Sequence, residues 1–179
     1  MIIRNVRAED LSEITELELR AFEPEAAADR ESFEYRLRAF PESFFVAETD
    51  GRVIGYVNGG ASNRKFITDD LFEPGQHCPI GENQMIFGLV VSPFYRNHGV
   101  GTALLNQMIG YAKKTKKKAI VLTCKETLVP YYEKLGFACA GISKSEIGGI
   151  LWKDMVKSLQ EQENNRRIEN EYVAGTGKL

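Results

Sequence analysis

The sequence lacks both a long apolar run and a strong excess of either charge. No apolar stretch in its 179 residues approaches the ~20 residues that a membrane-spanning helix needs, and the amino terminus, MIIRNVRAED, has no apolar signal core. The formal net charge is −2, so no large basic excess indicates nucleic acid as a partner. We therefore expect a cytoplasmic protein whose partners include neither a membrane nor nucleic acid.

Cysteine and histidine are also scarce. Cys78, Cys124 and Cys139 form an odd set at unrelated spacings, without a CxxC pair or a histidine at metal-ligand spacing. His77 stands beside Cys78, but two ligands without further partners do not make a metal site. We expect reduced thiols and no metal.

The length suits a single domain with one tail. A chain of 179 residues is enough for one core, and 43% apolar and 27% charged residues are ordinary for a globular protein. The chain becomes polar near its end. We expect one domain over residues 1–158, followed by a polar tail, helical or disordered, over residues 159–179.

The apolar pattern predicts alternating strands and helices. Helical spacing indicates helices at 9–21, 29–40, 99–114 and 128–135. Apolar or β-branched runs indicate strands at 1–6, 44–47, 53–57, 85–91, 118–124, 137–142 and 150–155. An Asp-Gly turn joins the second and third strands, and the unbroken run 85–91 is typical of one central strand covered on both faces. The polar segment 64–83 is a long loop. The fold class is α/β or α+β with a mixed sheet.

The segment SPFYRNHGVGTALL places Gly99 and Gly101 after Arg96, between an apolar run and a helical pattern. The first N–H groups of a helix have no partner within it and carry partial positive charge, so residues without side chains let an anion reach them. Phosphate is therefore the expected ligand. A Rossmann motif would need a third glycine where Leu104 stands, and a P-loop would need a lysine after its glycines, where Thr102 stands. A plain helix start, with glycines kept for packing, is the alternative.

The form Arg-x-x-Gly-x-Gly over residues 96–101 resembles the acetyl-CoA pyrophosphate loop of the Gcn5-related N-acetyltransferase (GNAT) superfamily. A second block, LTCKETLVPYYEKLGF, looks like the strand, loop and helix of the arylalkylamine (serotonin-type) branch. The resemblance covers residues 1 to about 158. It implies a mixed, mostly antiparallel sheet of about six to seven strands, flanked by about four helices. Because many relatives pair through their sheets, a homodimer is a further expectation.

The resemblance also implies the cofactor site. Acetyl-CoA would be the co-substrate, with its pyrophosphate on backbone N–H groups beside Arg96: those of Asn97, His98, Gly99, Val100, Gly101 and Thr102. The pantetheine arm would run along Leu89 and Val91 like an added strand. The thioester carbonyl would meet a backbone N–H near Val90 or Val91, which stabilises negative charge in acyl transfer.

Catalysis would be direct attack by a neutral amine on acetyl-CoA. Tyr132 matches the branch's general acid. A phenol, with a reference pKa of about 10, keeps its proton at neutral pH and can donate it. Tyr131 is the alternative residue for this role. The branch's paired histidines correspond to Met85 and Phe87, which take no proton. Glu82, through a chain of water, or an amine already neutral in solution would serve instead.

The acceptor is expected between the first two helices, the loop 64–83 and the short helix 128–135. The implied substrate-binding residues are Phe22, Thr123 and Cys124; an acetyl-cysteine intermediate on Cys124 is a minor hypothesis. Acidic residues that would attract a cationic amine are Glu23, Glu25, Asp29, Asp69, Asp70 and Glu73. The sequence thus predicts an N-acetyltransferase for a small primary amine, such as an arylalkylamine. A protein or peptide acetyltransferase and a non-catalytic CoA-binding module are the alternatives.

Overall fold

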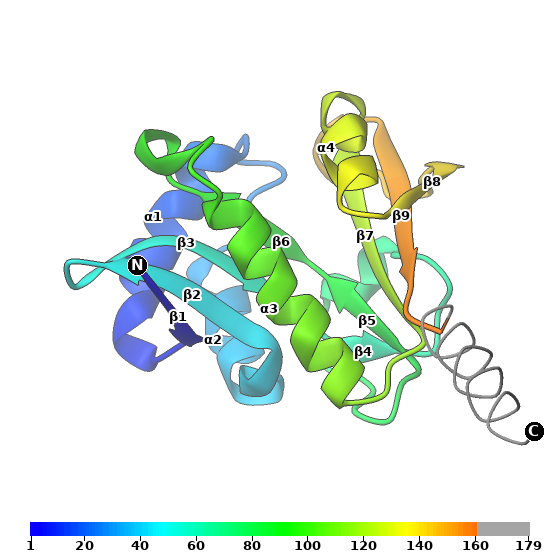
Figure 1. The fold of residues 1–179 in the computed structure, drawn as a ribbon, viewed down its shortest axis with the longest axis horizontal. Coiled ribbons are helices and arrows are strands. Elements are labelled where there is room, and N and C mark those ends of the chain that lie inside the picture. Colours follow the sequence, from blue (N-terminus) through cyan, green and yellow to red (C-terminus); the bar gives the residue numbers. More distant parts are fainter. Residues whose placement is uncertain (161–179) are drawn as a thin grey trace, which may run out of the picture.

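The fold consists of two sheets and four α-helices in a computed structural model that describes residues 1–160 (Figure 1). The helices are α1 (Leu11–Ala21), α2 (Arg30–Ala39), α3 (Val100–Lys114) and α4 (Val129–Lys134). The first sheet has the order β1 (Ile2–Asn5), β2 (Phe44–Thr49), β3 (Arg52–Asn58) and β6 (Gly88–Val91). The second has the order β4 (Ala61–Ser62), β5 (Asn83–Ile86), β7 (Ala119–Lys125), β9 (Trp152–Ser158) and β8 (Ala138–Ile142).

Strand pairing is antiparallel throughout residues 1–160 except between β5 and β7, which are parallel. The predicted mixed, mostly antiparallel fold with four helices is therefore confirmed. The described part of the chain holds nine strands, more than the six or seven expected, because one predicted strand is divided and the two-residue β4 is too short to leave a pattern. The predicted tail lies outside the described residues from 161 onwards.

Helices cover both faces of the first sheet. Successive residues of a strand point to opposite faces. Phe44, Val46, Val53 and Tyr56 pack in one cluster with residues of α1 and α2, whereas Phe45, Ala47, Ile54 and Val57 pack in another with α3. Figure 1 shows α3 crossing the face opposite α1 and α2. Each side therefore has its own apolar core, and β6 lies between them.

Local signals explain where several elements begin and end. The Asp29 side chain accepts a hydrogen bond from the Ser32 N–H (2.8 Å) and caps α2. Asp50 and Gly51 have φ angles of 50° and 74°, as a tight two-residue turn between β2 and β3 requires. The Asp-Gly hairpin predicted from the sequence is confirmed.

The run 85–91, predicted as one central strand, is two strands, and this prediction was wrong. β5 ends at Ile86 and β6 begins at Gly88, so β5 pairs with β7 while β6 pairs with β3. At the junction, the Phe87 N–H donates to the Asn58 carbonyl (2.9 Å), which holds the bend against β3. Apolar residues continue on both sides of the bend, so hydrophobicity alone gave no sign of it.

A side chain at Gly59 would collide with the neighbouring strand. An ideal Cβ there would lie 1.7 Å from the Met85 carbonyl oxygen. We expect Gly59→Ala to lower the free energy of unfolding by about 3 kcal/mol, because backbone must move to admit the methyl group. Gly110, inside α3, has nothing within 4 Å of the same position, so Gly110→Ala is the control and should raise that free energy by about 0.5–1 kcal/mol. Urea denaturation measures both free energies. A Gly59→Ala variant as stable as the wild type would contradict the close approach of Gly59 to the Met85 carbonyl.

Candidate active site

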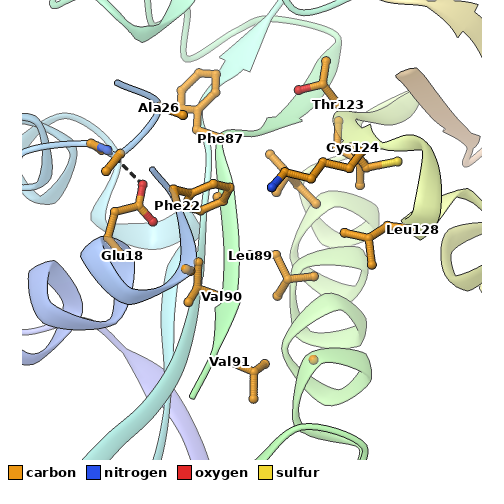
Figure 2. Close-up of a pocket in the computed structure, with 18 of the residues that line it drawn as sticks. Glu18, Phe22, Ala26, Phe87, Leu89, Val90, Val91, Thr123, Cys124 and Leu128 are labelled. Atoms are coloured by element: carbon orange, nitrogen blue, oxygen red, sulfur yellow. Dashed lines mark hydrogen bonds between the residues drawn. The ribbon is translucent and has the colours of Figure 1, made fainter. Parts of the chain in front are cut away.

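A cavity of about 980 Å³ opens where β6 and β7 diverge. Figure 2 shows Glu18 and Phe22 on one side of β6, and Thr123 and Cys124 on the other. The cavity continues along β6 to the glycine loop that begins α3. Its volume lies at the upper end of the range usual for ligand sites.

The glycine loop forms one end of the cavity. Gly99 is the N-cap of α3 with a φ of 78°, and Asn97 has a φ of 62°. Helix geometry leaves the N–H groups of Val100, Gly101 and Thr102 without partners in the helix, and no acidic residue stands in the first turn. These three residues line the cavity, together with Arg96, Asn97 and Gly99. The loop is therefore suited to hold an anion at the start of α3.

Two loop residues differ in their orientation. The Arg96 Nε donates to the Val91 carbonyl (3.2 Å), which fixes this side chain beside the end of β6. The ring Nδ1 of His98 lies 2.7 Å from the Arg96 carbonyl oxygen, and His98 is absent from the residues that line the cavity. The imidazole therefore lies on the surface of the loop, and only the backbone N–H of His98 is left as a candidate ligand for the anion.

Among the strands of residues 1–160, β6 has a neighbour on one edge, β3, and none on the other. The Ser92 N–H donates to the Ile54 carbonyl (2.8 Å), at the end of the β3–β6 ladder. In an antiparallel ladder successive residues alternate in direction, so the backbone of Val90 faces β3 while that of Leu89 and Val91 faces the open edge. Leu89 and Val91 thus offer backbone groups to an extended ligand, and their contact with pantetheine stays a prediction. The thioester carbonyl was expected near the N–H of Val90 or of Val91. Of these two groups, the Val91 N–H is the one at the open edge.

Tyr132 comes from α4 and is buried against aromatic rings. Its ring centroid lies 5.1 Å from that of Tyr131 and 5.7 Å from that of Phe137. Burial, then the neighbouring Cys124 and Tyr131, raises the pKa of the Tyr132 hydroxyl well above the usual range of a phenol. Tyr132 lines the cavity and keeps its proton at neutral pH, so it can act as a proton donor. Tyr131 instead turns to the glycine loop, where its hydroxyl lies 3.3 Å from the Thr102 Oγ1.

Thr123 and Cys124 reach the cavity from β7. Burial raises the pKa of the Cys124 thiol to about 11. Since the thiolate is the nucleophilic form, a protonated thiol is poorly suited to an acetyl-cysteine intermediate. Cys124 therefore serves as a small apolar wall of the cavity.

A buried carboxylate faces the cavity from α1. The Glu18 Oε1 accepts a hydrogen bond from the Ala28 N–H (2.9 Å), and its Oε2 accepts one from the Tyr56 hydroxyl. Burial raises the pKa of Glu18, although the bonds from Tyr56 and Ala28 and the charge of Arg36 act in the opposite direction. Each carboxylate oxygen retains a further acceptor position, so Glu18 can receive a donor from a ligand.

Glu18 and the neighbouring Arg36 were missed by the sequence reasoning, although the sequence holds a signal for both. Glu18 falls four residues after Ile14 on the buried stripe of α1, and Arg36 falls three residues after Phe33 on α2. A charged residue on the apolar stripe of a helix is costly to bury unless it has a partner or a function. Both residues line the cavity.

Comparison with known proteins identifies the family of the chain. Residues 9–137 match the acetyltransferase (GNAT) family. The chain belongs to this family. It is 29% identical over 167 residues to an uncharacterized N-acetyltransferase of Methanocaldococcus jannaschii, covering 88% of this chain and 66% of that protein. It is 26% identical over 112 residues to the serotonin N-acetyltransferase of Mesocricetus auratus, covering 62% of this chain and 53% of that protein.

The solved structures show the same fold. A GNAT-like decarboxylase, GphF, in complex with isobutyryl-CoA superposes with a TM-score of 0.77 at 19% identity, covering 89% of this chain and all (100%) of that one. The predicted superfamily and its fold are confirmed. The chain spans less than two thirds of the length of the first curated relatives it matches, and its membership of the GNAT family supports the predicted acyltransferase activity. The resemblance to the serotonin-type branch rests on one distant relative and remains a prediction.

In this GNAT protein Glu82 lies away from the cavity. Its carboxylate pairs with Lys118, and both side chains are about half exposed. The lining does not include Glu82, so the structure gives no support to the predicted base.

Met85, at one of the histidine positions, is fully buried with Ile67 and Leu71, whereas Phe87, at the other, lines the cavity. Some of the acidic residues expected at the mouth of the cavity are found there. Glu25, Asp29 and Glu73 line the cavity, whereas Asp70 pairs with Arg64.

Among residues 1–160, no group of three or more His, Cys, Asp or Glu side chains is placed to hold a metal ion. No helix in the same part of the chain is long and apolar enough to cross a membrane.

Gly101 leaves room for a ligand at the start of α3. An ideal Cβ there would lie 3.1 Å from the Tyr131 hydroxyl oxygen and 3.5 Å from the Val91 Cγ2. We expect Gly101→Val to weaken CoA binding by about tenfold or more, because the side chain would fill the space before the helix N–H groups. Titration calorimetry with CoA measures this, with Gly110→Ala as the control from the same helix. A dissociation constant equal to that of the wild type would rule out phosphate binding at this loop.

Proposed function

We propose that this protein transfers the acetyl group of acetyl-CoA to the primary amine of a small acceptor. One observation carries the proposal. A single cavity joins an anion-binding helix start, the open edge of β6 and two groups suited to proton transfer, Glu18 from α1 and Tyr132 from α4.

The donor half of the site is built from backbone. N–H groups of residues 97–102 would hold the pyrophosphate, with Arg96 beside them. The pantetheine arm would pair with Leu89 and Val91 at the open edge of β6, as an added strand does. The thioester carbonyl would then accept from the Val91 N–H, which stabilises the negative charge that develops on that oxygen.

The acceptor half supplies the proton transfers. The amine nitrogen uses its lone pair to attack the thioester carbon, and the carbon–sulfur bond breaks. The ammonium proton goes to Glu18, directly or through one water, and the departing CoA sulfur receives the Tyr132 proton. Because burial raises the pKa of Glu18, it is a stronger base than an ordinary glutamate. Glu18 thus replaces the base that the sequence placed at Glu82.

The walls of this half favour a small molecule. Phe22, Phe72 and Phe87 give it an aromatic lining, and two of its charged residues, Glu18 and Arg36, are buried. These features favour a compact acceptor with an apolar part, rather than the terminus of a folded protein.

The experiment is thiol release from acetyl-CoA across a panel of acceptors. The panel contains phenethylamine, tryptamine, spermidine, the twenty amino acids and a lysine peptide, and mass spectrometry confirms each acetylated product. We expect turnover on small amines. CoA binding in calorimetry without turnover on any acceptor would instead support a non-catalytic CoA-binding module, and turnover on the peptide alone would support a protein acetyltransferase.

A further inference from the structure

Arg36 is a buried cation without a carboxylate partner. The residue is 5% exposed, yet it lines the cavity. None of the ion pairs among residues 1–160 includes it. Within the described part of the chain, its side chain makes one hydrogen bond, from Nη1 to the Asn58 Oδ1 at 3.5 Å, the outer limit of such a bond. A buried charge normally has a close counterion, so this guanidinium is suited to receive an anion.

The surroundings hold the guanidinium in place. It lies over the rings of Phe33, Phe87 and Phe72, with 5.4, 5.6 and 6.0 Å from its central carbon to the ring centroids. The rings fix the plane of the group but leave most of its five N–H donors without an acceptor. The Asn58 Nδ2 beside it is also buried and has no partner in the described chain. Both observations indicate a missing acceptor of hydrogen bonds.

The position of Arg36 separates it from the phosphate site. It packs on Phe87, just before β6 begins, whereas the glycine loop follows the far end of that strand. The anion that it receives therefore belongs to the acceptor rather than to CoA. Glu18 bonds to Tyr56 and Arg36 lies over Phe33, two members of the same apolar cluster, and the charge of Glu18 acts on Arg36. The acceptor end thus presents one carboxylate and one guanidinium.

We propose that the acceptor is an α-amino acid with an apolar side chain, whose carboxylate binds Arg36 and whose amine faces Glu18. This inference rests on the proposed function and names its substrate class. A planar guanidinium fork matches a carboxylate with two parallel hydrogen bonds. The aromatic walls of Phe22, Phe72 and Phe87 accommodate the apolar side chain. An arylalkylamine lacks the carboxylate and would leave Arg36 unpaired.

The test compares amino acids with the same molecules lacking a carboxylate. Leucine is paired with 3-methylbutan-1-amine, methionine with 3-(methylthio)propan-1-amine, and phenylalanine with phenethylamine. Binding to the CoA complex is measured by calorimetry, and acetylation by thiol release. We expect at least one amino acid to bind about 100-fold more tightly than its amine, as two charge-assisted hydrogen bonds allow. Arg36→Gln should abolish this preference, because it weakens amino-acid binding far more than amine binding.

Two further variants separate recognition from folding. Arg38→Gln makes the same charge change at an exposed position on α2 and should keep the preference. Arg36→Lys keeps the charge without the fork and should retain only part of it. Thermal denaturation of each variant identifies any loss of fold.

Each outcome bears on the proposal. Equal binding of amino acid and amine, an equal effect of Arg36→Gln on both, or no binding of any amino acid overturns it. Acetylation of amines but not of amino acids would keep the proposed function and remove this inference. Amino-acid binding that depends on Arg36 without acetyl transfer would support the site and contradict the proposed function.

Discussion

Tyr132→Phe is expected to lower kcat by about 100-fold or more, the usual contribution of a general acid, with little change in CoA affinity. The substitution removes one oxygen and leaves the ring in its contacts with Tyr131 and Phe137. CoA sulfur would then leave as an unprotonated thiolate, which is the slower path. Steady-state kinetics with a turned-over acceptor gives kcat, and calorimetry gives the dissociation constant of CoA.

Tyr131→Phe is the matched comparison, because the two tyrosines are adjacent on α4. Its hydroxyl contacts Thr102 in the glycine loop, so its loss should raise the KM for acetyl-CoA rather than lower kcat.

The raised pKa of Tyr132 gives a second test of its role. The hydroxyl keeps its proton as pH rises, so kcat should show no fall attributable to this group up to about pH 10. A Tyr132→Phe enzyme with wild-type kcat would remove Tyr132 from the mechanism.

Glu18→Gln is expected to lower kcat/KM at neutral pH by about 100-fold or more, because an amide cannot take the amine proton. Glutamine has the same shape as glutamate and can still accept a hydrogen bond from Tyr56 or from the Ala28 N–H. The loss should shrink at high pH, where more of the acceptor amine is already neutral. A loss that stays constant across pH would show that Glu18 supports the structure instead of acting as a base.

The pH profile gives the sharper test of Glu18. A base works when deprotonated, so kcat/KM should fall as pH drops through the pKa of Glu18, above the ordinary glutamate value of about 4.3. The Tyr56 hydroxyl stabilises the ionised carboxylate, so Tyr56→Phe should raise that pKa and move the acidic limb to higher pH. Glu18→Gln should lose the limb. A limb that stays in place in both variants belongs to another group.

The sequence by itself determined the parts of this protein that depend on local order. Asp50 and Gly51 were enough to predict the hairpin, because their turn requires positive φ angles. Arg96, Gly99 and Gly101 were enough to predict an anion site, because a helix start and its glycines are adjacent in the chain. The family resemblance then placed Tyr132, whose position on α4 follows from a short contiguous block.

Only the tertiary structure decided what the acceptor half contains. Glu18 meets Tyr56 and Arg36 meets Phe87 across separations in the chain that no local pattern records. The division of the run 85–91 depends on its contacts with residues 58–60, and it opens the edge of β6 that a continuous strand would not expose. Glu82 was the base expected from the sequence, yet it stands just before β5 and pairs with Lys118. Burial and pairing of charges arise only when distant segments pack, and those two properties select the groups that can bind and deprotonate an acceptor.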